Sequence, residues 1–297
     1  TQAPRPTIDV LEFMLKEIID SSLFDGLVEL YLKDLQNGLV LHFTHNRIDE
    51  EDIPVNIAYS SWSTIKIPVM VSAFRRISAP YDPNDLIMME QMIERSDNDS
   101  TDALAKAVID PTFAPMEVTE DMKALGIENT YWAGFFAPGS PMLQDYKTPA
   151  NQRTDFSTEP DRYAQTTPQD LGLLLEDIYY CAKDYGGSFP LAFNGEITQE
   201  ECQLMVDYLA LNKIGVLIQA GVPANVTVAH KHGWAYEVDD GYIHTIADAG
   251  IVYTPGGDYV LSIFAYHPVQ AVFEPVNQLF AKLSQAVYSY YNLVAAQ

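Results

Sequence analysis

Three short segments, Ser63-Thr64-Ile65-Lys66, Ser96-Asp97-Asn98 and Lys231-His232-Gly233, decide how this chain folds and where its chemistry lies. A serine and a lysine three residues apart share one face of a helix. A serine hydroxyl is a weak nucleophile until a base takes its proton, and a lysine amine acts as that base when its pKa is lowered. The first segment therefore has the residue types and the spacing of a nucleophile and its base.

Each segment also has a simpler interpretation when it is taken alone. The first is a capping serine followed by a solvated lysine, and the second is a set of cap and turn residues between two helices. The third is the end of a strand with a turn glycine. The joint occurrence of all three, each in a suitable secondary-structure context, favours the chemical interpretation.

The hydrophobic pattern predicts a chain of the α/β (α+β) class, in the order helix, two strands, helical middle, three strands, helix. The predicted strands are residues 27–35, 39–44, 226–229, 243–253 and 259–266. The predicted helices are residues 8–20, 63–77, 84–95, 99–109 and 119–126, two helices opened by Thr167 and Thr198, and residues 274–294. Residues 127–167 show no period, which is typical of a long functional loop.

Strands from both ends of the chain can form one five-stranded antiparallel sheet flanked by helices. We therefore expect a sheet-containing α/β domain from residues 1–62 and 213–297, with an all-helical domain, residues 63–212, inserted between them. The first segment lies where the chain leaves the sheet and the third where it returns. The site is then expected at the domain boundary, where ligand clefts are common.

Composition excludes several classes of function. The formal net charge of −24 argues against nucleic acid or an anionic membrane surface as a partner. No apolar run of about 18 residues predicts a membrane span. The histidines and cysteines have no metal-type spacing, and no phosphate-binding loop is present, so we expect no metal and no cofactor. Cys181 and Cys202 lie where two consecutive helices meet, as a disulfide or, with at least equal weight, as two buried thiols.

The three segments resemble the S-x-x-K, S-D-N and K-T-G motifs of serine β-lactamases and penicillin-binding proteins, with most similarity to class A β-lactamases. The flank Ser63–Pro68 also looks like the nucleophile helix of class D enzymes. The resemblance implies the β-lactamase/transpeptidase fold over nearly the whole chain. It also implies site roles: Ser63 as nucleophile, Lys66 as base, Ser96 as proton relay, Asn98 as ligand of the substrate amide, Lys231 as anchor of a substrate carboxylate, Gly233 as the point of substrate approach, and Trp234 N–H as partner of Ser63 N–H in an oxyanion hole.

Three departures qualify that resemblance. The gap between Ser63 and Ser96 is short, so the aromatic wall usually built there is expected to be missing. His232 stands where the motif has a hydroxyl residue; an imidazole becomes cationic near pH 6, so we expect turnover of anionic substrates to rise as His232 is protonated. The E-x-x-L-N loop that class A enzymes use to release the acyl group is absent, which leaves three candidates for activating water: Asp155, Glu159 and Asp161.

The leading hypothesis is a serine hydrolase that opens a β-lactam through an acyl-enzyme on Ser63. A D-Ala-D-Ala peptidase-like enzyme or an esterase is the first alternative, and a binder or sensor that acylates and stops is the second. A carboxylated Lys66, as in class D enzymes, would supply the missing base. We expect a monomer that acts on a small molecule outside the cytoplasm. Residues 1–6 lack a basic region followed by an apolar region, so we expect no signal peptide in this sequence, as in a mature secreted form or a shortened chain.

Overall fold

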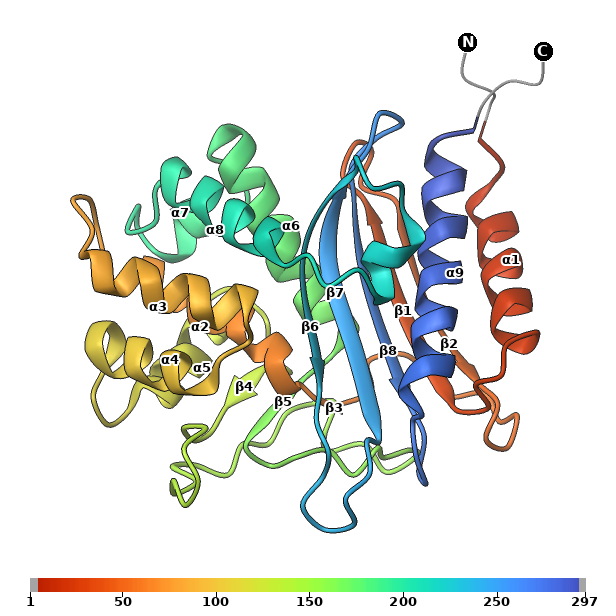
Figure 1. The fold of residues 1–297 in the computed structure, drawn as a ribbon, viewed down its shortest axis with the longest axis horizontal. Helices are drawn as coiled ribbons and strands as arrows, with labels where there is room; N and C mark the ends of the chain where they lie inside the picture. The colour runs from red at the N-terminus through yellow and green to blue at the C-terminus, as the bar shows by residue number, and fades with distance from the viewer. Residues whose placement is uncertain (1–4, 294–297) are drawn as a thin grey trace.

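The computed structural model describes residues 5–293, and a five-stranded antiparallel sheet runs through its centre (Figure 1). The strand order is β2-β1-β8-β7-β6. The strands are β1 (Leu27–Asp34), β2 (Val40–Asn46), β6 (Thr227–Trp234), β7 (Thr245–Tyr253) and β8 (Tyr259–Tyr266). Because β1 pairs with β8, with Leu30 opposite Ile263, the two ends of the chain share one sheet, as the sequence predicts.

Two terminal helices cover one face of this sheet. They are α1 (Ile8–Asp20) and α9 (Phe273–Tyr291), which lie side by side on the right of Figure 1. One apolar core joins them to the strands, and it includes Leu15 of α1, Leu283 of α9 and Ile263 of β8. The predicted end of the last helix, Val294, lies outside the described residues.

The helical middle of the chain packs against the other face. Its elements are η1 (Trp62–Ile65), α2 (Lys66–Phe74), α3 (Pro83–Glu94), α4 (Asn98–Leu104) with its π-helical continuation η2 (Ala105–Ile109), α5 (Ala114–Ala124), α6 (Pro168–Asp184), α7 (Phe189–Ala192) and α8 (Gln199–Leu211). Among them α6 lies directly on β1, β7 and β8. A second apolar core fills the space between these helices and the sheet. The short helix η3 (Leu217–Gly221) that follows packs instead against α9.

Three short strands that the sequence does not indicate form a second sheet. They are β3 (Tyr59–Ser60), β4 (Tyr131–Trp132) and β5 (Ala164–Thr166), in the order β3-β5-β4. This sheet joins both ends of the aperiodic segment 127–167 to the residues just before η1. The long loop is thereby placed beside the first motif.

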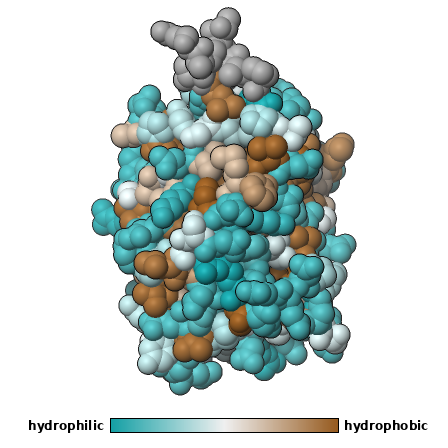
Figure 2. Space-filling model, turned by 90° about the vertical axis from the view of Figure 1, so that its right-hand side faces the viewer, coloured by the Kyte–Doolittle hydropathy of each residue, from teal (hydrophilic) through white to brown (hydrophobic). Residues whose placement is uncertain are grey.

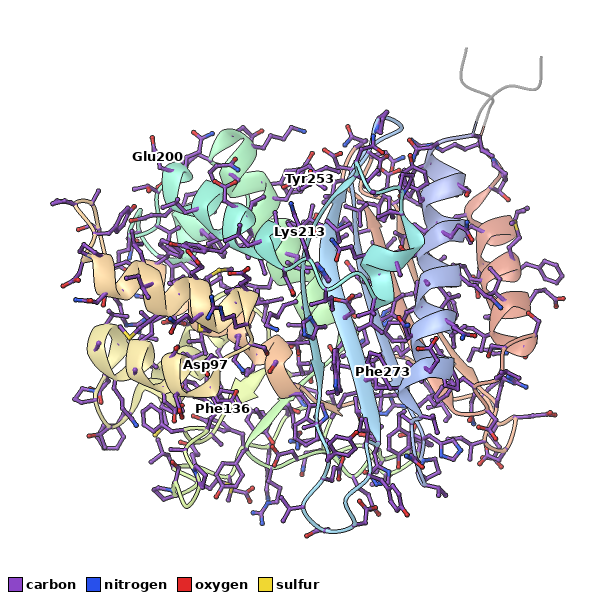
Figure 3. The ribbon with its side chains drawn as sticks, viewed as in Figure 1. Asp97, Phe136, Glu200, Lys213, Tyr253 and Phe273 are labelled. Atoms are coloured by element: carbon purple, nitrogen blue, oxygen red, sulfur yellow. A yellow bond between two sulfur atoms is a disulfide. The ribbon has the colours of Figure 1, made fainter. Side chains whose placement is uncertain are left out.

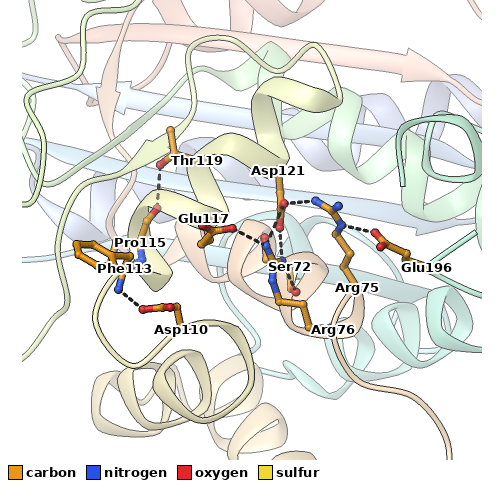
Figure 4. Close-up of polar contacts among 10 residues, drawn as sticks. All are labelled: Ser72, Arg75, Arg76, Asp110, Phe113, Pro115, Glu117, Thr119, Asp121 and Glu196. Atoms are coloured by element: carbon orange, nitrogen blue, oxygen red, sulfur yellow. Dashed lines mark hydrogen bonds and ion pairs between the residues drawn. The ribbon is translucent and has the colours of Figure 1, made fainter. Parts of the chain in front are cut away.

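Side-chain caps fix the first residues of α6 and α8. Thr167 accepts a hydrogen bond from Asp170 N–H at 3.1 Å, and Thr198 forms a capping box with Glu201, as the sequence predicts. The predicted start of a helix at Thr119 is wrong, because α5 begins at Ala114. Asp110 takes up the N–H groups that precede this helix, including that of Phe113 at 2.6 Å (Figure 4).

A buried carboxylate ties α2 to α5. Asp121 of α5 is 1% exposed and accepts hydrogen bonds from the guanidinium groups of Arg75 and Arg76 at the end of α2 (Figure 4). Arg75 also reaches Glu196, and Arg76 reaches Glu117. This cluster fixes the C-terminal end of α2, opposite the end that carries Lys66, against α5.

Cys181 and Cys202 form a disulfide with a sulfur–sulfur distance of 1.96 Å. It joins the last turn of α6 to the first turn of α8. Of the two alternatives that the sequence leaves open, the pair of free buried thiols is therefore wrong.

Figure 2 shows the side of the molecule on which α1 lies, and hydrophilic side chains dominate it, with scattered apolar ones between them. The exposed apolar side chains of α1 are Val10, Phe13 and Met14. Within residues 5–293, no helix combines the length and the apolar character that a membrane crossing needs.

Candidate active site

Ser63 and Lys66 meet at the junction of η1 and α2. Lys66 Nζ donates a hydrogen bond to Ser63 Oγ at 2.9 Å. The lysine is fully buried, and burial lowers its pKa to about 7 in spite of the opposing negative charges of Asp97 and Asp102. Desolvation disfavours the ammonium form, so a large share of Lys66 is an unprotonated amine at neutral pH. The first motif thus has the geometry and the basicity of a nucleophile and its base.

The loop between α3 and α4 brings the second motif to the same place. Asn98 Oδ1 accepts a second hydrogen bond from Lys66 Nζ at 2.6 Å. Asp97 caps α4 through Ser100 N–H at 2.7 Å, and the Ser100 hydroxyl, followed by this N–H, lowers the pKa of the Asp97 carboxyl group. Ser96 has a left-handed backbone conformation (φ 59°) that turns the chain sharply between the two helices. The resulting turn points Ser96 toward the sheet.

The third motif completes the centre from the edge strand β6. Lys231 Nζ donates to Ser96 Oγ at 3.0 Å and to the carbonyl of His232 at 3.2 Å. Its side chain is fully buried, and burial together with the nearby positive charge of Lys66 holds the pKa of Lys231 well below its usual value. Two serine–lysine pairs therefore lie in one buried centre: Ser63 with Lys66, and Ser96 with Lys231.

Gly233 lets the edge strand approach η1. A Cβ atom at this position would lie 2.9 Å from both Ser61 O and Ser63 N. Since real Cβ atoms do not come so close to backbone atoms, any other residue would push β6 away from the nucleophile. The sequence suggests glycine for the approach of a substrate, whereas the structure gives it a role in strand packing.

His232 differs from its predicted behaviour. Its ring is buried, and Nδ1 lies 3.1 Å from the side-chain amide nitrogen of Asn212, so Nδ1 accepts and the proton is assigned to Nε2. Burial, and then the positive charges of Lys231 and His230, lower the pKa of His232 to about 2. The prediction that His232 is protonated near pH 6 is therefore wrong, because its imidazole stays neutral throughout the ordinary pH range.

A cavity of about 630 Å³ opens above this centre. Its polar lining includes Ser63, Ser96, Asn98 and His232, and Trp234 lies at its edge. No described residue between Ser63 and Ser96 lines it. Its aromatic lining comes instead from other segments: Trp62, Trp132, Phe135, Phe136, Tyr163 and Trp234.

Phe136 covers Lys66, and nothing in the sequence singled it out. Its ring centroid lies 4.4 Å from Lys66 Nζ, and Figure 3 shows Phe136 below α2 on the same side as Asp97. The buried carboxylate of Asp102 accepts the backbone N–H groups of Phe136 and Ala137, each at 2.9 Å. The length of the aperiodic loop was the single available signal that this segment carries function.

The three candidates for activating water are placed differently. Asp155 forms a salt bridge with Arg153 at 2.6 Å, which lowers its pKa to about 2, and it does not line the cavity. Glu159 is exposed and lines a separate acidic hollow near Glu237. Asp161 does line the cavity, and burial raises its pKa. Of the three, Asp161 alone keeps a position suited to the predicted role.

The comparison with protein families agrees with this geometry. A model described as "Beta-lactamase enzyme family" matches residues 81–291, which is more than half of the chain. The chain belongs to this beta-lactamase family. The matched span includes the second and third motifs and begins after Ser63 and Lys66. A search of curated proteins found no match.

Solved structures show the same fold at low sequence identity. A structure of PBP-A is 19% identical, covers 98% of this chain and 99% of its own, and has a TM-score of 0.64. The TLA-1 extended spectrum beta-lactamase is 14% identical, with coverages of 95% and 98% and a TM-score of 0.66. A class A beta-lactamase from Bacteroides cellulosilyticus is 17% identical, with coverages of 96% and 98% and a TM-score of 0.64. These likenesses support the mixed α/β fold.

Proposed function

We propose that this protein is a serine hydrolase in which Ser63 forms an acyl-enzyme with a β-lactam or a related activated amide or ester. The observation that carries the proposal is the 2.9 Å hydrogen bond between Ser63 Oγ and the buried Lys66 Nζ. An amine with a pKa of about 7 is close to the ideal strength for a general base at neutral pH.

The acylation step follows from this arrangement. Unprotonated Lys66 takes the proton of Ser63 as Oγ attacks the carbonyl carbon, and the N–H groups of Ser63 and Trp234 receive the oxyanion. The carbon–nitrogen bond then breaks, and the leaving nitrogen needs a proton. Ser96 relays it from Lys66, which holds the proton of Ser63, and Lys231 Nζ keeps Ser96 in position by donating to its Oγ at 3.0 Å. Asn98 orients the substrate amide.

Release of the acyl group is proposed to be slow. Phe136 occupies the space over Lys66 Nζ, and the carboxylate that lines the cavity among residues 5–293 belongs to Asp161. The position of Phe136 favours the second candidate function, a peptidase-like enzyme or a sensor in which the acyl-enzyme persists, and leaves Asp161 as the candidate for activating water. Carboxylation of Lys66 would instead give rapid turnover, and added bicarbonate would then raise the steady-state rate.

The setting of the activity is also a proposal. A disulfide persists in oxidising compartments, so the Cys181–Cys202 bond supports a site of action outside the cytoplasm. We propose a monomer that acts on a small molecule, with the chain divided into two units at residues 62/63 and 212/213 and the catalytic centre between them.

Intact-protein mass spectrometry with benzylpenicillin, paired with a chromogenic cephalosporin assay, tests the proposal. We expect one covalent adduct on the wild type and none on Ser63→Ala, with Ser140→Ala as the matched control because Ser140 lines the same cavity. A long-lived adduct with a single burst favours the slow peptidase or sensor, and continuous turnover favours a β-lactamase. An adduct that persists in Ser63→Ala would overturn the assignment of the nucleophile.

A further inference from the structure

The cavity of this enzyme offers no exposed positive charge. Lys66 and Lys231 are both fully buried, and neither belongs to the cavity lining. Two of the hydrogens of Lys231 Nζ are already donated, to Ser96 Oγ and to the carbonyl of His232. His232 itself is neutral. Among the described residues that line the cavity, the charged side chain is an acid, Asp161.

Asp161 is held close to the nucleophile. Its backbone N–H donates to Ser60 Oγ at 2.8 Å, three residues before Ser63, and its Oδ1 accepts Tyr163 N–H at 3.1 Å. The carboxyl group is partly buried. The neighbouring cation, Arg162, points to Asp145 at 3.1 Å and does not line the cavity. The negative charge of Asp161 therefore faces the cavity without a basic partner of its own in this lining.

A second acid near Asp161 and the charge of the whole protein add negative potential at the cavity. Glu237, on the loop after β6, is near enough that the charge of Asp161 helps to raise its pKa, after burial. Aromatic side chains of the cavity lining, including Trp62 and Tyr163, are of the kind whose ring faces attract cations. The net charge of −24 adds a long-range field that draws cations toward the surface and repels anions.

We propose that this cavity selects acyl donors that carry an ammonium group, with Asp161 and the aromatic lining as its binding site, and that it discriminates against donors with an additional carboxylate. The proposal rests on the proposed function, because it names the substrate class of the same site. It differs from the role that the resemblance implies for Lys231, whose amine lies beneath the cavity lining.

Three penicillins that differ at one carbon atom of the side chain test this selectivity: ampicillin with an amine, benzylpenicillin with hydrogen and carbenicillin with a carboxylate. We expect second-order acylation rate constants at about pH 6 to fall in that order. A partly buried ion pair combined with an aromatic contact corresponds to about tenfold between the first and the last. Asp161→Asn should bring the three values together, whereas Asp239→Asn, which removes an exposed charge outside the cavity, should leave the order intact.

Two further measurements keep the outcome decisive. On the wild type, raising the salt concentration should shrink the advantage of ampicillin, since exposed charges are screened. Calorimetric binding of the same three compounds to Ser63→Ala reads the charge preference without any acylation. Equal dissociation constants for the three penicillins, or tightest binding of carbenicillin, would overturn the proposal. Absence of any adduct on the wild type, with the binding order preserved, would instead overturn the proposed function alone.

Discussion

The rate of acylation should depend on pH through a single group, Lys66. With a pKa of about 7, about one tenth of the amine is unprotonated at pH 6 and about nine tenths at pH 8. The acylation rate constant should therefore rise about tenfold between these values and then reach a plateau, because only the neutral amine accepts the proton of Ser63. A lysine with its ordinary pKa of 10.5 would give a rate that still climbs tenfold per pH unit at pH 9.

Removing one neighbouring charge should move this profile in a defined direction. The carboxylate of Asp97 favours the ammonium form of Lys66, so Asp97→Asn should lower the pKa of Lys66 and shift the rise to lower pH. One charge close to an ionisable group shifts the pKa of that group by about one unit. Asparagine caps a helix as well as aspartate does, so α4 should keep its start. Asp99→Asn, in the first turn of the same helix, is the matched control.

Stopped-flow measurement of the acylation burst with a chromogenic cephalosporin, at constant ionic strength from pH 5.5 to 9.5, provides both profiles. Circular dichroism at each pH should confirm that the protein stays folded. A rate constant that is flat from pH 6 to 9, or that rises beyond pH 9 without a plateau, would refute Lys66 as the base. A profile of Asp97→Asn that moves to higher pH would refute the electrostatic reasoning.

Three other changes have equally definite outcomes. Gly233→Ala should abolish acylation and lower the melting temperature, because its Cβ would meet backbone atoms at 2.9 Å; a fully active, stable variant would contradict the packing of β6. Asp121→Ala should cost about 3 kcal/mol in urea unfolding, since two guanidinium groups lose a buried partner, and acylation of the folded fraction should stay unchanged. Replacing both Cys181 and Cys202 by serine should cost about 3 kcal/mol, as expected for a bond that closes a loop of this length, whereas an unchanged unfolding midpoint would show that the bond adds no stability.

The acylating half of the site could be predicted because local rules govern it. Ser63 and Lys66 are three residues apart at a helix start, and a helix brings such residues together whatever surrounds them. The short apolar runs of the late strands likewise predict β7 and β8 almost to the residue. The capping box of Thr198 predicts the start of α8, since it involves only residues next to one another in the sequence.

The other half could not be predicted, since it depends on contacts between distant segments. Phe136 lies in an aperiodic loop, and its position follows from a hydrogen bond to Asp102, 34 residues earlier in the chain. His232 looks like a pH-sensitive group in sequence, but its burial beside Lys231 and His230 keeps it neutral. Thr119 has the local pattern of a cap, yet Asp110 takes up the free N–H groups first and moves the helix start.

The two hydrogen bonds between Asp102 and the backbone of the loop have a consequence for sequence variation in this protein. Asp102 grips backbone N–H groups, which every residue except proline possesses, so the wall over Lys66 keeps its shape whatever side chain stands at position 136. The backbone shape of the loop and the chemical character of the side chain at position 136 can therefore change independently. Substitutions at position 136 can therefore change the chemical group that faces Lys66 while the backbone of the loop stays in place.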